Sequence, residues 1–190
     1  MKSELSSQQI ANYQKDGFVV IEDFLTVQEL DLWRAALDEA LKNRKGNKLP
    51  GRKEVYGKGD DADKSYYDNV FDQMINLWQD NESIRGIMLD ERIGKMAAEL
   101  AQVDGIRIWH DQALIKKPWA NPAAWRLNTP YCYPGIKPTY RRAMTCAYRF
   151  DGNVFNGIQN ILSDEQVAAL RLGDELNNPQ INPLVYSRKR

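Results

Sequence analysis

The chain has little histidine, little cysteine and no cluster of metal-binding side chains. His110 is the single histidine in 190 residues, so these residues cannot supply two imidazole ligands to one metal ion. Cys132 and Cys146 have no metal-ligand spacing, and we expect both to be reduced and structural. One histidine also gives no Ser/His/Asp arrangement, and no base lies near Cys146 in the sequence to make it a nucleophile.

An excess of charge and a long apolar run are missing too. Lys and Arg total 26, and so do Asp and Glu, so the balanced charge gives no general attraction to nucleic acid or to a membrane surface. No stretch reaches the ~18 apolar residues that span a bilayer. Residues 1–9 are polar and lack the apolar part of a secretory signal. We therefore expect a cytoplasmic protein without nucleic-acid or membrane partners, and its oligomeric state stays open.

What is present is a mixture of helix and strand signals over one domain, residues 1–190. Helices are predicted from Ser6 or Ser7 to Gly17, from the capping box Thr26–Glu29, at 81–89 and 91–101 with Asn81 and Asp90 as caps, and from Ser163 to Gly173. The second helix carries Leu30, Trp33, Leu37 and Leu41 on a face expected to be core. Strands are predicted at 18–21, 106–115 and 143–150. Residues 42–64 are predicted to be a long charged loop, and the tail 177–190 to be loosely packed.

Five segments in chain order resemble the phytanoyl-CoA dioxygenase-like family of Fe(II)/2-oxoglutarate oxygenases. They are Tyr13–Ile21 with its central Asp-Gly-Phe and the capped helix that follows, Trp109–Pro118, Pro122–Trp125, Tyr140–Tyr148 and Gln180–Tyr186. Each motif is weak alone. Their common order across nearly all of the chain carries the resemblance.

The resemblance implies a particular chemistry. The family holds Fe(II) with two histidines and one carboxylate, which leaves three metal positions for cosubstrate and oxygen. An H-x-D on a strand supplies two of these ligands because residues i and i+2 share a face, and a distant histidine supplies the third. 2-Oxoglutarate chelates the iron, and its far carboxylate pairs with a basic residue. The family reaction couples its oxidative decarboxylation to hydroxylation of a small or lipid-like substrate.

This chain departs from the family pattern at the metal ligands. After Trp125 it reads Arg126-Leu127-Asn128 where the family has H-x-D. Arg126 has no lone pair to donate, Asn128 is at best a weak neutral ligand, and no later histidine follows. We therefore assign no metal ligand and no catalytic residue in this chain.

A second departure is the short segment after Asn128. Only Thr129–Tyr140 separate it from Arg141, whereas several strands of the family's jelly-roll and its distal histidine belong there. At roughly 8–12 residues for a strand and its turn, this segment cannot hold them. The expected fold is α+β, with N-terminal helices packed on an incomplete double-stranded β-helix sheet whose core strands are missing between 128 and 141. A deletion, a gene-model error or recombination would each produce this gap.

Two residues match the family's 2-oxoglutarate contacts. Lys116 matches the lysine that helps hold 2-oxoglutarate, and a slip of one residue would exchange it for Lys117. Arg141 matches the arginine that pairs with the far carboxylate. The alternatives are a solvated lysine at a strand end and a surface arginine beside Arg142.

The remaining candidates are read as structural. His110 and Asp111 are adjacent on a predicted strand and point to opposite faces, so they do not chelate one ion, and a hydrogen-bonded strand histidine is expected. Trp109, Trp119 and Trp125 are more often core residues than walls of a substrate pocket.

Three functional hypotheses follow. The first is a member of the oxygenase family, with Fe(II), 2-oxoglutarate and a small-molecule substrate implied by the resemblance, that is itself catalytically inactive. The second is a non-catalytic protein that binds 2-oxoglutarate or another anion, or an interaction protein. The third is a truncated product without function, which would expose strand edges and aggregate.

Overall fold

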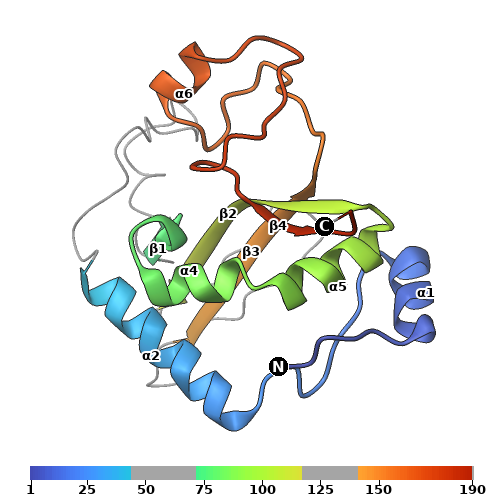
Figure 1. The fold of residues 1–190 in the computed structure, drawn as a ribbon. Helices are drawn as coiled ribbons and strands as arrows, with labels where there is room; N and C mark the ends of the chain where they lie inside the picture. The colour runs from blue at the N-terminus through green and yellow to red at the C-terminus, as the bar shows by residue number, and fades with distance from the viewer. Residues whose placement is uncertain (44–71, 117–140, 190) are drawn as a thin grey trace. The chain divides into compact units, whose positions relative to one another are not determined.

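The structure, a computed structural model, describes residues 1–43, 72–116 and 141–189 (Figure 1). Its helices are α1 (Ser7–Asp16), α2 (Val27–Asn43), the 3-10 helix η1 (Leu77–Gln79), α4 (Glu82–Met88), α5 (Glu91–Ala101) and α6 (Asp164–Ala168). Its strands are β1 (Asp72–Ile75), β2 (Gly105–Lys116), β3 (Arg141–Phe150) and β4 (Leu184–Ser187). Nearly all of the predicted loop at 42–64 lies outside the described residues. Within the described ranges, no helix has the length and apolar character to cross a membrane.

The chain forms two compact units. The first contains Met1–Asn47, Asn76–Asp111 and Cys146–Arg190, and the second contains Lys48–Ile75 and Gln112–Thr145. The helices described above and β4 belong to the first unit. β2 and β3 each contribute residues to both units, so the expectation of one domain over residues 1–190 stays a prediction.

The strands form one sheet in which β2 has three neighbours. The order is β1-β2-β3, and β4 also pairs with β2. β1 runs antiparallel to β2 with Asp72 opposite Ile115, and β4 runs antiparallel to β2 with Gly105 opposite Ser187. The predicted strands at 106–115 and 143–150 are therefore confirmed.

The helix ends follow the predicted capping residues. The Ser6 hydroxyl accepts from the backbone N–H of Gln9, and Gly17 ends α1 with a φ of 78°, which favours glycine. Asn81 and Asp90 cap α4 and α5. α6 begins after its cap Ser163 as predicted but ends at Ala168.

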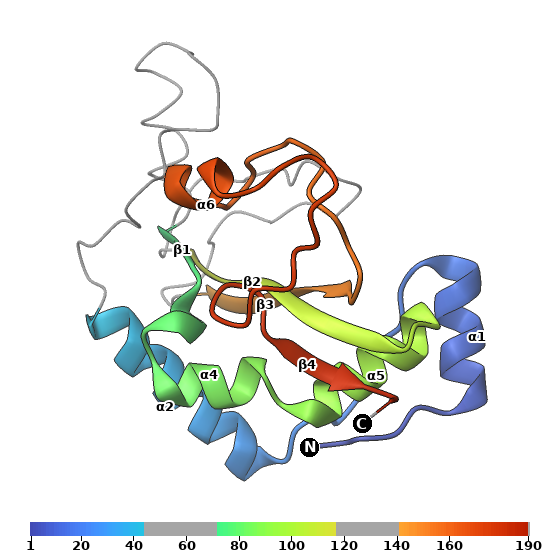
Figure 2. The same ribbon diagram turned by 45° about the horizontal axis from the view of Figure 1, so that its top comes forward.

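In the first unit, helices cover one face of the strands. α4 packs against α2 and η1, and α5 packs against α1 and β4. Figures 1 and 2 show α4 and α5 along one face of β2 and β4, with the segment that carries α6 on the other side. The buried side chains that join these elements include Ala36, Leu37, Ala40, Leu77, Trp78, Ile84, Met88, Met96, Ala98, Ile106, Ile108 and Val185. On α2, Leu37 of the predicted core face is buried together with Ala36 and Ala40, Trp33 and Leu41 are half-buried, and Leu30 is 36% exposed.

Two sequence predictions are wrong. Residues 18–21 are not a strand, and Phe18 and Val20 are 65% and 70% exposed. A strand needs a neighbour for its backbone hydrogen bonds, and the sheet of the described residues gives this segment none. The tail is not loosely packed, because β4 pairs with β2, Val185 is buried, and Asn182 donates to the carbonyl of Ile108 at 3.1 Å.

Candidate functional site

The two residues predicted to contact 2-oxoglutarate lie at the ends of neighbouring strands. Lys116 is the last residue of β2, and Arg141 is the first residue of β3. Asp151 donates its N–H to the carbonyl of Gly105 at 2.9 Å, and Thr145 Oγ1 donates to the carbonyl of Gln112 at 3.4 Å. A step forward on β2 thus matches a step back on β3, so the two strands run antiparallel, and the last residues of β2 and the first residues of β3 are at the same end of this strand pair.

The segment that departs from the family's metal motif lies outside the described residues. This holds for Trp125, for Arg126-Leu127-Asn128 and for the short stretch up to Tyr140. Lys117 and Trp119 lie there too. The sequence gives the residue types at 126 and 128, and their match to the family's H-x-D position stays a prediction.

Asp111 is a buried carboxylate whose two oxygens are both occupied by backbone donors. Its Oδ1 accepts the N–H of Leu77 at 2.7 Å, and its Oδ2 accepts the N–H of Trp78 at 2.8 Å. Its side chain is fully buried, and its backbone carbonyl accepts the N–H of Asn76 at 3.1 Å. Because the first N–H groups of a helix have no partner within the helix, this carboxylate satisfies the start of η1. In the sequence, the only signal for this buried carboxylate was an acidic residue within a mostly apolar predicted strand.

His110 lies next to Asp111 on β2 and is half-buried. Successive strand residues point to opposite faces, so its imidazole does not join the Asp111 carboxylate around one ion. In the described ranges, no group of three His, Cys, Asp or Glu side chains is placed to hold a metal. These residues therefore do not fit the iron that the family uses.

Cys146 and Tyr148 on β3 are weakly acidic side chains that are half-buried. Burial raises the pKa of the Cys146 thiol to about 12, because the thiolate would lose its hydration. Burial likewise raises the pKa of Tyr148, whose hydroxyl donates to the carbonyl of Met88 at 2.8 Å. The expectation that Cys146 is a structural residue agrees with this setting.

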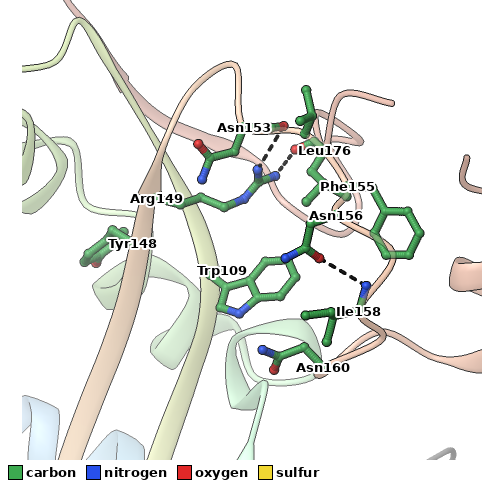
Figure 3. Close-up of a pocket in the computed structure, with 10 residues that line it drawn as sticks. Trp109, Tyr148, Arg149, Asn153, Phe155, Asn156, Ile158, Asn160 and Leu176 are labelled. Carbon is green, nitrogen blue, oxygen red and sulfur yellow. Dashed lines mark hydrogen bonds between the residues drawn. The ribbon is translucent and has the colours of Figure 1, made fainter. Parts of the chain in front are cut away.

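A cavity of about 310 Å³ lies in the first unit, beside Trp109 and Arg149 (Figure 3). Its walls come from β2, the end of β3 and the loops that follow, namely Trp109, Tyr148, Arg149, Asn153, Val154, Phe155, Asn156, Ile158, Asn160 and Leu176. Trp109 was expected to be a core residue, but it is half-buried and lines this cavity. Sequence reasoning missed the site, because its walls are up to 67 positions apart in the chain.

Comparison with known families decides the ancestry. The phytanoyl-CoA dioxygenase (PhyH) family matches residues 13–153. The chain belongs to this family. PhyH proteins depend on iron and 2-oxoglutarate, so the family predicted from five weak motifs is confirmed. A comparison with curated proteins finds no match.

One solved structure has a similar fold over nearly the whole chain. The nogalamycin-biosynthesis epimerase SnoN, in complex with Fe3+, alpha-ketoglutarate and nogalamycin RO, matches with a TM-score of 0.66 and 15% identity, over 94% of this chain and 97% of that one. The carbocyclase SnoK matches with a TM-score of 0.48 and 24% identity, over 63% of this chain and 42% of that one. The chain thus spans less than half of the SnoK structure. The predicted fold class, α+β with helices on a sheet of the jelly-roll type, is confirmed.

Proposed function

We propose that this chain is a PhyH-family protein that does not catalyse the family's hydroxylation. The observation that supports the proposal is the state of the only histidine–acid pair, His110-Asp111, in the described β2. The Asp111 carboxylate is already bound by two backbone N–H groups, and the chain has no second histidine. With Arg126 and Asn128 at the family's H-x-D position, a facial set of two imidazoles and one carboxylate has no source within these residues.

The proposal is tested first by metal binding, which needs no knowledge of the substrate. The purified chain is dialysed against Fe(II) without oxygen, and retained iron is measured against protein. We expect far less than one iron per chain. Stoichiometric iron, or Fe(II)-dependent conversion of 2-oxoglutarate to succinate above the rate of a protein-free sample, would contradict the proposal.

A second candidate function is the binding of a dicarboxylate without iron. It is favoured by the antiparallel pairing of β2 and β3, which supports the placement of Lys116 and Arg141 at the same end of this strand pair. Two cations at such a place match the two carboxylates of 2-oxoglutarate, and arginine adds a bidentate contact. The candidate uses the residues of the family site but none of its redox chemistry.

Calorimetric titration with 2-oxoglutarate in the presence of a chelator tests this candidate. We expect saturable binding that falls by about tenfold or more in K116Q and in R141Q, because each loses a charge-assisted contact. R142Q is the matched control, since it removes the same charge one position along β3. No heat and no thermal shift would end the idea, and an equal loss in R142Q would show that Arg141 is not the specific contact.

The short segment between 128 and 141 belongs to the same proposal. We infer that core strands of the family fold are missing there. Sequencing the coding locus across codons 125–142 decides between a true gap and an error of the reading frame. A frame that encodes H-x-D and a distal histidine would replace the proposed inactivity with the family reaction.

A further inference from the structure

The cavity beside Trp109 contains a cation whose hydrogen-bonding capacity is not used up. The Arg149 guanidinium donates to the carbonyls of Asn153, at 3.5 Å, and Leu176 (Figure 3). Its Cζ lies 5.6 Å from the centroid of the Trp109 ring. Its Nε is buried and has no hydrogen-bond partner among the described residues. One donor of this group therefore stays unsatisfied beside the cavity.

The positive charge of Arg149 is only partly balanced, because Asp151, the acidic group that acts on it, forms its ion pair with Arg107. In the described part of the chain, no ion pair joins it to an acidic side chain, whereas neighbouring Arg107 binds Asp151 with Nε 2.5 Å from Oδ1. The polar walls Asn153, Asn156 and Asn160 are neutral amides. Burial, and then repulsion by Arg107, lower the pKa of Arg149 to about 10 against an opposing attraction by Asp151, so it is still charged at neutral pH. A charge partly withdrawn from water without an ion pair of its own is costly, and a bound anion would relieve that cost.

The walls of the cavity restrict what such an anion looks like. Its volume of about 310 Å³ is at the lower end of ligand pockets, which hold roughly 300–1,000 Å³. Trp109, Phe155 and Leu176 supply apolar and flat surface. Ile158 and Val154 also line the cavity, although they are 65% and 51% exposed, so further apolar surface is available for a ligand to cover.

We propose that this cavity binds a small carboxylate with a flat apolar body, and that Arg149 provides its counter-charge. The site is separate from Lys116 and Arg141, and it uses residues of the first unit alone. The guanidinium selects the negative head, the amides orient it, and the aromatic and aliphatic walls hold the body.

Benzoate is the probe, and neutral benzamide and small acetate are its matched comparisons. Calorimetry or NMR titration of the full chain is expected to show saturable benzoate binding about tenfold or more tighter than that of either comparison. Benzoate binding no tighter than that of benzamide would overturn the role of charge. Benzoate binding no tighter than that of acetate would overturn the role of the apolar walls.

Variants place the binding in the cavity. Asn156→Asp puts a negative charge on the wall while its oxygen still accepts the N–H of Ile158, which the wild-type side chain binds at 3.1 Å. We expect this variant to lose benzoate affinity by about tenfold or more. Asn12→Asp adds the same charge on α1, which does not line the cavity, and should change affinity by less than about twofold. Equal affinity in the two variants would overturn the site.

Arg149→Gln removes the counter-charge itself and should abolish benzoate binding. Because Arg149 also holds two loop carbonyls, its thermal unfolding is measured beside that of the wild type. If Arg149→Gln does not fold, benzoate binding is measured with Leu176→Trp instead. This variant fills the cavity, so it should also abolish benzoate binding, and unchanged affinity would overturn the site. K116Q and R141Q are expected to leave benzoate affinity unchanged, and a loss in either would assign benzoate to the strand-end pair and overturn the cavity site.

Discussion

The two ends of β2 differ in how their polar groups are used. At the Gly105–Asp111 end, β4 pairs with the backbone, and the carboxylate of Asp111 holds two N–H groups of η1. At the other end, β2 pairs with β1, finishes at Lys116, and leads in sequence to Arg126-Leu127-Asn128. The polar groups described at the first end are satisfied by protein partners, without a metal ion. The proposed loss of the iron ligands is therefore compatible with a folded chain, because a buried carboxylate and strand pairing stabilise this end of β2.

The largest effect is expected from the first end of β2. Asp111→Ala leaves the buried N–H groups of Leu77 and Trp78 without an acceptor, which should lower the free energy of unfolding by about 3–5 kcal/mol. Urea denaturation measures it. Asp31→Ala is the control, because Asp31 forms an exposed pair with Arg34 on α2 and should cost less than about 1 kcal/mol. Equal losses would mean that Asp111 is no more structural than a surface acid.

The packing of β4 on α5 is tested by two glycines. A Cβ at Gly94 would lie 2.8 Å from Tyr186 Cβ and from Val185 Cγ1, so Gly94→Ala should destabilise by about 1–3 kcal/mol. Gly86→Ala is matched to it, because Gly86 is exposed on α4 with no atom within 4 Å of the added Cβ, and it should stabilise by about 0.5–1 kcal/mol. Thermal unfolding separates the two, and a gain in both would indicate a loosely packed tail.

The second end of β2 is tested by restoring ligands. The double variant Arg126→His and Asn128→Asp returns an imidazole and a carboxylate to alternate positions. We expect Fe(II) affinity to rise by about tenfold or more over the wild type, and succinate formation to stay at background because the distal histidine is still missing. Dialysis and product analysis measure the two. Turnover by this variant would show that two protein ligands suffice in this chain.

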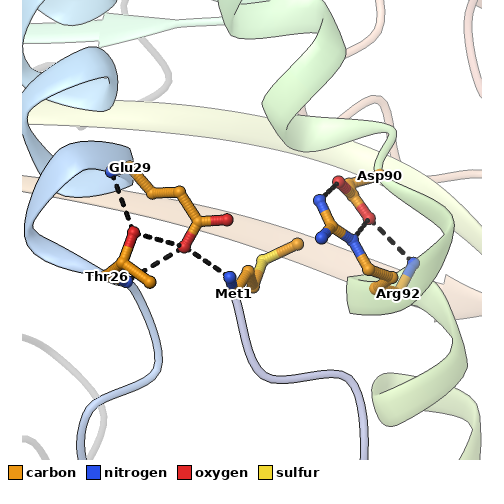
Figure 4. Close-up of polar contacts among 5 residues, drawn as sticks. All are labelled: Met1, Thr26, Glu29, Asp90 and Arg92. Atoms are coloured by element: carbon orange, nitrogen blue, oxygen red, sulfur yellow. Dashed lines mark hydrogen bonds and ion pairs between the residues drawn. The ribbon is translucent and has the colours of Figure 1, made fainter.

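The capping box of α2 is a smaller contact of the same structural kind. Glu29 N–H donates to Thr26 Oγ1 at 3.2 Å, and Thr26 N–H donates to Glu29 Oε2 at 2.9 Å (Figure 4). Thr26→Ala should cost about 1 kcal/mol of unfolding free energy, and Thr26→Ser, which keeps the hydroxyl, should cost less. Equal free energies of unfolding for Thr26→Ala and Thr26→Ser in chemical denaturation would show that the capping box does not stabilise α2.

The Glu29 carboxyl gives the pH dependence of this contact. The Met1 amino group, then the Thr26 N–H, lower its pKa from 4.5 to about 2 (Figure 4). Because the folded pKa lies below the ordinary one, the stabilisation is present above pH 4.5 and is lost as the pH falls toward 2. NMR titration should place the midpoint near 2, and a midpoint near 4.5 would show that these contacts do not form in solution.

Local signals were predictable from the sequence, and long-range ones were not. Ser6, Asn81, Asp90 and Ser163 cap helices as predicted, because a cap acts on donors two or three residues away. Residues 18–21 had the composition of a strand, but composition does not supply the neighbour that a strand needs.

The site shows the same limit. The residue types at 126 and 128 could be read from the sequence, and the prediction that they replace the family's ligands rests on a motif that is local. The binding of Asp111 to Leu77 and Trp78, and the meeting of Trp109 with Arg149, depend on tertiary contacts between distant positions.

The pairing of β2 with β4 has a consequence during synthesis of the protein. Residues 105–107 meet residues 184–187, so β2 receives this neighbour only after the ribosome has made about 80 further residues. Until then, that end of β2 presents unpaired backbone groups, which is where a growing chain pairs wrongly with another. Slow translation after codon 107 would therefore favour chaperone dependence in this protein.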